Sequence, residues 1–360
     1  MALADVAAAV AASGPVSKST SRFRWGLIGP GGIARRFAGA VRHLPACSLV
    51  AVAGRRRERA QAFADAWADG DATIAVASSI PELLARTDLD AVYVATPHAF
   101  HPEAVHACLD AGLPVLCEKP LAPTAAQARA MVAHARERGV FLMEAMWTRF
   151  LPVYAEVARW LQRGAIGELR AMQSSFGLSN PFDAHHRCYD AAQAGGALLD
   201  IGIYNLAVTR WVLEQAQGRC PDLSSVQAHA VLAPTGVDQR LSAQLQFDGG
   251  VVAQMFCAFD TVADNSFRIQ GEGGSIVMPT DFWQATRAAL STAGGESVQI
   301  DCPFDINGFE GEILEAMRCV RAGQIESACM PHAETLALAD WMDGIRRQVG
   351  VRYPFEPETP

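Results

Sequence analysis

The feature that constrains this chain most is a glycine-rich turn directly after a short apolar segment near its start. Residues 23–28 (FRWGLI) have the composition of a buried strand, and residues 29–34 (GPGGIA) fit the pattern G-x-G-x-x-A before an apolar helical segment. Strand, glycine turn and helix in this order indicate a dinucleotide-binding βαβ unit. The residues expected around the cofactor phosphates are Gly29, Gly31, Gly32, Ile33 and Ala34.

The end of the second predicted strand indicates which nicotinamide cofactor is bound. NAD-binding sequences usually carry an acidic residue there, whereas this chain has Ser48–Ala53 followed by Gly54 and three arginines. A guanidinium can pair with the 2′-phosphate of NADP, which a carboxylate would repel. We therefore predict that Arg55 binds NADP, with NAD less favoured, and we interpret Arg57 and Arg59 as the solvated start of the next helix.

Short β-branched segments alternate with helical segments from Phe23 to about Glu144, as a parallel α/β sheet requires. The other predicted elements are strands Thr73–Ala77, Ala91–Ala95, Pro114–Cys117 and Val140–Met143, and helices that include Pro102–Ala111 and Thr124–Arg138. Nucleotides bind beyond the carboxyl ends of such strands. Two segments at these ends are therefore expected at the cofactor: Thr96, Pro97 and His98, and Glu118 with Lys119.

The character of the sequence changes after Trp147, where an α+β domain with an open, mainly antiparallel sheet is predicted. Its expected elements are a helix to about Arg163, strand Leu169–Phe176, helix Gly196–Leu213, strands Gln239–Phe247, Val251–Phe259, Phe267–Gln270 and Ser275–Met278, and helices Phe309–Arg321 and His332–Val349. Asp248 and two glycines mark a hairpin. We expect apolar side chains such as Met255 and Phe259, or their alternates along the strand, on the outer sheet face, and hence a homodimer or homotetramer formed through it.

Length and composition limit the class of protein. A chain of 360 residues with 50% apolar content supports two cores. We predict a loose tail at 1–22, an NADP-binding Rossmann domain at 23–145, and a substrate-binding and oligomerisation domain at 146–360. The alternative for the tail is an arm that packs on a neighbouring subunit.

Charge and cysteine content point to the partners and the compartment. A net charge of −8 and a pI near 5.6 argue against nucleic acid or an anionic membrane as partner, and no apolar run is long enough to span a bilayer. Nine cysteines occur without a C-x-x-C pair, which favours the reducing cytoplasm.

Several motifs together resemble the Gfo/Idh/MocA oxidoreductase family over nearly the whole chain after the tail. They are residues 29–34, 95–97 with His101, 118–120, and 195–204 (GGALLDIGIY). Residues 141–150 and the C-terminal IRRQVG with Tyr353 and Pro354 look most like the dihydrodiol dehydrogenases and NADP-dependent D-xylose dehydrogenases of that family. The resemblance implies reversible oxidation by NADP⁺ of a hydroxyl group in an aldose or a cyclic trans-diol. One departure is Thr124, where relatives often carry asparagine, although threonine can also cap a helix.

Oxidation of an alcohol requires a base beside the substrate oxygen, and Lys119 and Tyr204 are the candidates. An adjacent ammonium favours the phenolate form of tyrosine. We therefore assign Tyr204 as proton acceptor and Lys119 as the group that lowers its pKa, with the exchanged roles as an open alternative. Asp200 lies four residues before Tyr204, on the same helix face, where it can bind substrate hydroxyls and the Lys119 ammonium.

Further residues have weaker indications. Glu118 is expected to orient its loop or contact the ribose, a cis bond before Pro120 is suggested by the family pattern, and His101 could simply cap a helix. Trp147, Arg149 and Phe150 are candidates for the substrate pocket, with core packing as the alternative for both aromatic residues. His185 and His186 lack a completing ligand cluster, so we expect no metal. The rival functions are a non-catalytic ligand-sensing protein and a glycoside hydrolase that uses nicotinamide transiently.

Overall fold

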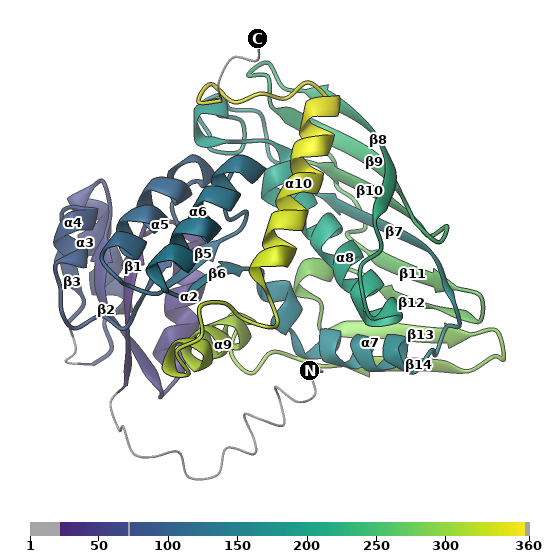
Figure 1. The fold of residues 1–360 in the computed structure, drawn as a ribbon, viewed down its shortest axis with the longest axis horizontal. Coiled ribbons are helices and arrows are strands. Elements are labelled where there is room, and N and C mark those ends of the chain that lie inside the picture. Colours follow the sequence, from purple (N-terminus) through teal and green to yellow (C-terminus); the bar gives the residue numbers. More distant parts are fainter. Residues whose placement is uncertain (1–21, 71–72, 357–360) are drawn as a thin grey trace. The chain divides into compact units, whose positions relative to one another are not determined.

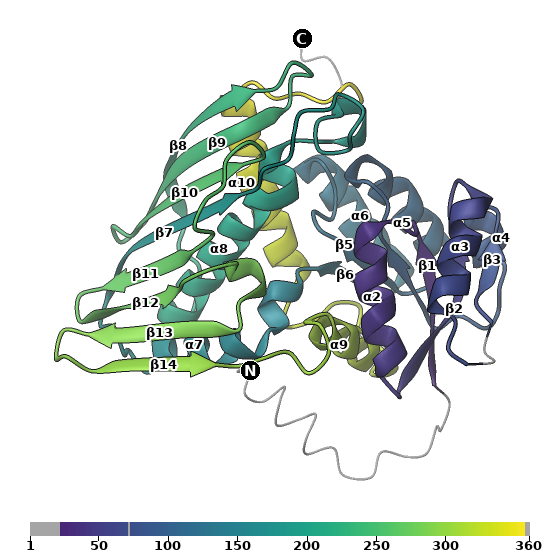
Figure 2. The ribbon, with the colours of Figure 1, turned by 180° about the vertical axis from the view of Figure 1, so that it is seen from behind.

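The computed structural model describes residues 22–70 and 73–356, and these residues form two compact units (Figures 1 and 2). The nucleotide unit comprises the described residues up to Trp147 together with Asp305–Leu336, and the second unit comprises Thr148–Phe304 with the residues from Ala337 onward. The prediction for residues 1–21 of the tail lies outside the described residues. The predicted boundaries differ from these units in two respects, because residues 146–147 and residues 305–336 group with the nucleotide unit.

The nucleotide unit contains a six-stranded parallel sheet in the order β3-β2-β1-β4-β5-β6, which is the Rossmann order. Its strands are β1 (Phe23–Ile28), β2 (Cys47–Ala53), β3 (Ala75–Ala77), β4 (Ala91–Val94), β5 (Val115–Glu118) and β6 (Leu142–Ala145). Every residue of β4, β5 and β6 is buried, as expected for strands covered on both faces. The predicted fold class of this part is confirmed.

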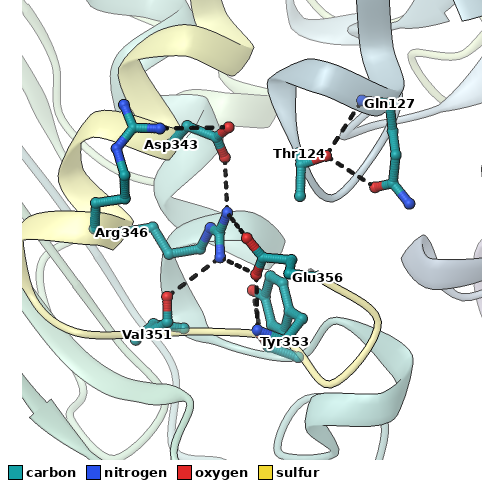
Figure 3. Close-up of polar contacts among 9 residues, drawn as sticks. Thr124, Gln127, Asp343, Arg346, Val351, Tyr353 and Glu356 are labelled. Atoms are coloured by element: carbon teal, nitrogen blue, oxygen red, sulfur yellow. Dashed lines mark hydrogen bonds and ion pairs between the residues drawn. The ribbon is translucent and has the colours of Figure 1, made fainter. Parts of the chain in front are cut away.

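Helices cover both faces of the parallel sheet, with α5 and α6 on one face and α2 on the other (Figures 1 and 2). The helices of the unit are α2 (Gly32–His43), α3 (Arg57–Trp67), α4 (Ile80–Leu84), α5 (His101–Asp110), α6 (Ala125–Arg138) and α9 (Glu310–Arg321). The expected capping role of Thr124 is confirmed, since its hydroxyl accepts a hydrogen bond of 3.2 Å from the Gln127 N–H (Figure 3).

Residues 305–336 join the nucleotide unit through contacts that a local sequence pattern does not reveal. The Leu142 N–H donates to the Ile325 carbonyl at 3.1 Å, and His332 Nε2 lies 2.9 Å from the Leu142 carbonyl. In the same unit, Asn307 and Arg36 exchange hydrogen bonds, from Arg36 Nη2 to the Asn307 carbonyl at 2.6 Å and from Asn307 Nδ2 to the Arg36 carbonyl at 2.8 Å. Residues 305–336 are therefore part of the nucleotide unit, although in the chain they follow the strands of the second unit.

The second unit is built on an eight-stranded sheet in the order β14-β13-β12-β11-β7-β10-β9-β8. The strands are β7 (Leu169–Gly177), β8 (Leu223–Leu232), β9 (Asp238–Phe247), β10 (Val252–Ala258), β11 (Phe267–Gly271), β12 (Gly274–Met278), β13 (Arg287–Thr292) and β14 (Ser297–Asp301). Only β7 and β10 pair in parallel. The predicted open, mainly antiparallel sheet is confirmed. Strands β8, β13 and β14 were not predicted; β8 and β14 bury few side chains and so lack a clear apolar alternation.

One face of this sheet packs on α7 (Pro152–Gln162), α8 (Ile203–Gln217) and the part of α10 (His332–Gln348) that belongs to the second unit (Figure 1). Short 3₁₀ segments are η1 (His98–Phe100), η2 (Trp147–Phe150), η3 (Ala191–Gln193) and η5 (Phe282–Gln284), and η4 (Leu198–Gly202) is a π-helical turn. None of the helices within residues 22–70 and 73–356 is long and apolar enough to cross a membrane.

The outer sheet face does not carry Met255 and Phe259. These residues are 4% and 0% exposed and belong to the core. The pleat places their alternates outward: Gln254, which pairs with Gln244 of β9 and Gln173 of β7, and the partly exposed Val252 and Phe256. The outward face at the centre of the sheet therefore mixes polar and apolar side chains.

Candidate functional site

The glycine turn after β1 has the geometry that a bound dinucleotide requires. Gly29 has φ +92°, and a Cβ atom there would lie 2.8 Å from the backbone of Ala95 and Thr96. The space around Gly32, by contrast, is open, because a Cβ atom on Gly32 would have no neighbour within 4 Å. No side chain caps the start of α2 at Gly31, which is compatible with anion binding at this helix N-terminus. Ala34 is fully buried, whereas Ile33 is 39% exposed.

A cavity of about 650 Å³ continues outward from this turn, between α2 and α3. Its lining consists of the turn and one side of each helix: Pro30, Gly31, Gly32, Arg35, Arg59, Ala62, Phe63, Ala66 and Trp67. Arg59 is exposed, as predicted, and in addition lies in the cavity wall with Arg35. Arg55 is exposed at the end of β2, with its guanidinium 4.9 Å from the centre of the Phe100 ring.

Lys119 lies at the carboxyl end of β5, in a loop that is fixed on both sides. Before it, the Tyr93 hydroxyl of β4 donates to Glu118 Oε1. After it, the Lys119–Pro120 bond is cis, as the family pattern suggested, and the Leu121 N–H donates to Glu144 Oε1 at 2.8 Å. Lys119 is partly exposed between buried neighbours. The Lys119 amine is thus carried by a loop that hydrogen bonds hold on both sides.

His101 links the two carboxyl-end loops, which is a different role from the helix cap considered above. It is fully buried, with Nδ1 2.9 Å from the Pro120 carbonyl and Nε2 2.8 Å from the Thr96 carbonyl. Burial lowers the pKa of His101 to about 4, so the ring is neutral at pH 7 and can donate to only one carbonyl at a time. The position of the Lys119 loop is in this way tied to that of the Thr96 loop.

Two further predicted cofactor residues lie at the same edge of the sheet. His98 is 6% exposed, with its ring centre 5.9 Å from that of His101. The buried hydroxyl of Thr96 has no hydrogen-bond partner among the described residues. A buried polar atom of this kind calls for an explanation, and a ligand group at the carboxyl end of β4 provides one. The residues present therefore fit a bound dinucleotide.

In the second unit, Asp200 lies in the π-helical turn η4 and Tyr204 in the first turn of α8. Asp200 is 7% exposed and accepts two hydrogen bonds from Arg187, at 3.0 and 3.3 Å. Arg187, whose side chain is 49% exposed, was missed by sequence reasoning because it stands in a loop without a pattern. π-turns inside helices occur often at functional sites.

The turn before Asp200 is held by residues from distant parts of the chain. Asp238 Oδ2 on β9 accepts from the Leu198 N–H at 2.6 Å, and a Cβ on Gly196 would lie 2.3 Å from Asp238 Oδ1. Burial raises the pKa of Asp238 to about 7. The Tyr353 hydroxyl of the C-terminal segment donates to the Gly195 carbonyl at 2.8 Å.

The C-terminal segment that carries Tyr353 is fixed by a buried arginine. Figure 3 shows Arg346 of α10 between Asp343 and Glu356, with hydrogen bonds of 3.0 and 2.9 Å from its Nη2. The Tyr353 N–H donates to the same Glu356 at 2.7 Å. The C-terminal segment is therefore part of the support for the Asp200 turn.

Aromatic side chains lie beside Tyr204. Its ring centre is 6.0 Å from that of Phe176 on β7, and Phe176 stacks on Trp283 with a centre distance of 3.4 Å. Neither residue was singled out from the sequence, because each looks like an ordinary core aromatic. Trp283 is partly exposed, so this stack offers a flat apolar wall.

The predicted pocket residues are mostly buried. Trp147 is 3% exposed and contacts Phe309, with a ring-centre distance of 5.0 Å, in the nucleotide unit. Arg149 is 5% exposed and lies 3.6 Å from Glu214 of α8. Phe150 is partly exposed. Within the part of the chain that the structure describes, no three His, Cys, Asp or Glu side chains are grouped to hold a metal.

Comparisons with known proteins agree over both units. Residues 23–146 match the family described as "Oxidoreductase family, NAD-binding Rossmann fold", and residues 154–277 match the "GFO/IDH/MocA C-terminal domain". The chain is 36% identical over 338 residues to the trans-1,2-dihydrobenzene-1,2-diol dehydrogenase of Homo sapiens, and 37% identical over 343 residues to that of Danio rerio. In both cases the match covers 92% of this chain and 98% of the relative.

A solved structure is similar over almost the same length. It is a 3-ketoreductase from Actinomadura kijaniata in complex with NADP and TDP-benzene, with a TM-score of 0.80 and 28% sequence identity. The similarity covers 91% of this chain and 98% of the ketoreductase.

Proposed function

The chain belongs to the Gfo/Idh/MocA oxidoreductase family, and from this premise we propose that it transfers a hydride between NADP and a hydroxyl-bearing carbon of a sugar or a cyclic trans-diol. The diol dehydrogenases at 36–37% identity and the NADP-bound ketoreductase support this class of reaction. NADP⁺ supplies the hydride acceptor. The chain supplies the site that binds it and the groups that bind the substrate and move its proton.

The observation that carries the proposal is the lysine at position 119. The chain has 28 arginines but only two lysines, Lys18 and Lys119. Every other long basic side chain in the described residues is an arginine. Arginine keeps its proton at any physiological pH, whereas an amine can release one. A lone lysine in the fixed loop after β5 therefore supports a role in proton transfer, which arginine cannot perform.

Tyr204 and Asp200 are the groups we assign to the substrate in the second unit. In this assignment the Tyr204 phenolate accepts the proton of the substrate hydroxyl, and the Lys119 ammonium lowers the pKa of Tyr204. In the alternative the lysine is the base and Tyr204 holds the oxygen. Asp200, paired with Arg187, binds neighbouring substrate hydroxyls through the remaining lone pairs of its oxygens. The Phe176–Trp283 stack next to Tyr204 supports a ring-shaped substrate, since flat apolar walls suit the faces of sugars and cyclic diols.

Cofactor binding is assigned to the glycine turn and to the arginines near it. The α2 N-terminus binds the diphosphate, and Thr96, Pro97, His98 and Glu118 line the nicotinamide end. Arg55 at the end of β2 binds the 2′-phosphate, and Arg35 and Arg59 in the cavity wall strengthen the positive potential there. A guanidinium cluster of this kind supports NADP over NAD.

We also propose a homodimer formed through the second sheet. In the central segments 171–175, 242–246 and 252–256 the outward side chains are Ala, Ser, Gln, Val and Phe, none of them charged. Gln227, Gln244, Gln254 and Gln173 stand in register across four strands. A flat uncharged face on a chain of net charge −8 is suited to a second copy of itself. Gln254→Glu should shift the sedimentation equilibrium towards monomer, while Gln299→Glu on the edge strand β14 should not.

A substrate panel tests the proposed reaction. NADPH formation would be followed with D-xylose, D-glucose and trans-dihydrodiols, and NADPH consumption with 1,2-dicarbonyls, each with NAD(H) in parallel and with Lys119→Met as the control for contaminating activity. Turnover with at least one of these compounds is expected. Tight NADP binding without turnover of any of them would instead favour the ligand-sensing alternative, and release of a glycan without net reduction would favour the hydrolase.

We propose the cytoplasm as the compartment. All nine cysteines lie in the described residues and none of them forms a disulfide, which supports this assignment. Fractionation of the source cells with an antibody against the chain would test this assignment.

A further inference from the structure

A carboxylic acid that the proposed reaction does not use lies buried in the nucleotide unit. Glu312, in the first turn of α9, is 0% exposed, and neither of its carboxyl oxygens has a hydrogen-bond partner in the structure. An ionised carboxylate without a donor cannot be held in such a position at acceptable cost, so the group must be neutral or its surroundings must be charged.

The charged and titratable groups around Glu312 come from three elements. They are Glu118 on β5, Tyr93 on β4 and Arg36 on α2. Arg36 is the cation of this set, and its Nε and Nη2 both donate to the Asn307 carbonyl, at 3.0 and 2.6 Å. Its guanidinium also lies 4.2 Å from the centre of the Trp147 ring. The Arg36 guanidinium thus contacts Asn307 and Trp147, whereas the other carboxyl group around Glu312 is that of Glu118.

The two carboxyl groups differ in their hydrogen bonds. Glu118 accepts the Tyr93 hydroxyl hydrogen, whereas Glu312 accepts none from any described residue. Burial, together with the charge of Glu118, raises the pKa of Glu312 well above its ordinary value, against the opposing effect of Arg36. The proton of this buried pair therefore resides on Glu312.

We propose that Glu312 is a positioning residue for the Lys119 loop: as a neutral acid it allows Glu118 to keep the Tyr93 hydrogen bond that fixes the backbone beside Lys119. Loss of the Glu312 proton would place two negative charges in one dry space and push Glu118 away from Tyr93. The effect on activity rests on the proposed function, but the effect on stability does not.

The sign of the pH dependence follows from the direction of the shift. Because the folded chain holds the Glu312 proton more tightly than the unfolded chain, the stabilisation is complete below the ordinary glutamate pKa and is lost as the pH rises through the raised one. Over that window the folding equilibrium constant of the native protein should fall by up to about tenfold per pH unit from this group. Glu312→Gln, a neutral isostere, should lack this fall.

The experiment compares the melting temperature and NADPH binding of the native chain, Glu312→Gln and Glu315→Gln from pH 5 to pH 9.5. Glu312→Gln should match the native protein at low pH and exceed it in stability at high pH. Glu315 is the matched control: it is buried one turn further along α9, but paired with Arg318 at 2.8 Å. Its glutamine variant should lose stability and keep the native pH dependence.

The outcomes separate the inference from the proposed function. Equal pH dependence of Glu312→Gln and the native chain, or a loss of stability in Glu312→Gln that grows with pH, would overturn the inference while leaving the enzyme assignment intact. If Glu312→Gln fails to fold, Glu312→Met serves instead, because no hydrogen bond of Glu312 is lost; its failure to fold as well would also overturn the inference. With an active substrate, the native kcat/KM should decline at high pH by a factor that Glu312→Gln does not share.

Discussion

The loop that carries Lys119 and the turn that carries Asp200 are fixed in different ways. The Lys119 loop is held by Tyr93, His101 and Glu144, which lie in the neighbouring strands and helix of the same parallel sheet. The Asp200 turn is held by Asp238 and by Tyr353, which lie 38 and more than 150 residues further along the chain. The Lys119 loop is thus fixed by residues between positions 93 and 144, whereas the Asp200 turn depends on contacts between distant segments of the chain.

The largest effect should come from the amine of the nucleotide unit. Lys119→Met is expected to lower kcat/KM by about a thousandfold, because it removes the charge that favours the Tyr204 phenolate and, in the alternative, the base itself. The melting temperature should hardly change, since Lys119 is partly exposed. Lys119→Arg separates the two assignments: it should retain much of the activity if Tyr204 is the base, because the positive charge remains, and should be nearly as inactive as Lys119→Met if the lysine is the base. Steady-state kinetics that showed full activity in Lys119→Arg would refute the lysine as the base.

Tyr204→Phe should have the next largest effect, about a hundredfold on kcat with a small change in KM. If the phenol and the amine act on one oxygen, the double variant with Lys119→Met should be no worse than the lysine variant alone. Additive losses in this double-mutant cycle would mean that the two groups act in separate steps. Rapid single-turnover measurements would exclude product release as the limiting step.

Within the nucleotide unit, Arg59→Ala should raise the KM for NADP by about tenfold and leave that for NAD nearly unchanged, because loss of this guanidinium weakens the positive potential around the 2′-phosphate that Arg55 binds. Arg57→Ala is the control, since Arg57 is exposed on the same helix but does not line the cavity. Equal changes for the two cofactors would assign Arg59 a general rather than a 2′-phosphate-specific role.

The smallest effect on kcat is expected for a residue of the second unit, Tyr353. Tyr353→Phe removes the hydrogen bond to Gly195 and should destabilise the fold by about 1–3 kcal/mol, because a buried carbonyl is left unsatisfied. The kcat should fall severalfold, while the dissociation constant of NADP, measured by fluorescence, should stay constant. An unchanged kcat would limit Tyr353 to a structural role.

Prediction from sequence succeeded where function and fold depend on neighbours in the chain. The glycine turn, the six parallel strands and the loop with Lys119 follow from local periodicity and from residues that must be small. Strands β8 and β14 were not predicted, because most of their side chains face solvent and leave no apolar alternation in the sequence. Phe176 and Trp283 escaped because a buried aromatic residue has the same sequence signature in a core as in a pocket wall.

The sequence by itself determined a nucleotide-binding α/β domain with a lone titratable amine at its functional edge, because glycine turns and strand ends are local properties. Only the tertiary structure decided that Arg187 pairs with Asp200, that Arg59 lines a cavity, and that Glu312 is buried without a hydrogen-bond partner. Each of these features depends on how whole elements pack against one another, and no local sequence pattern contains that information.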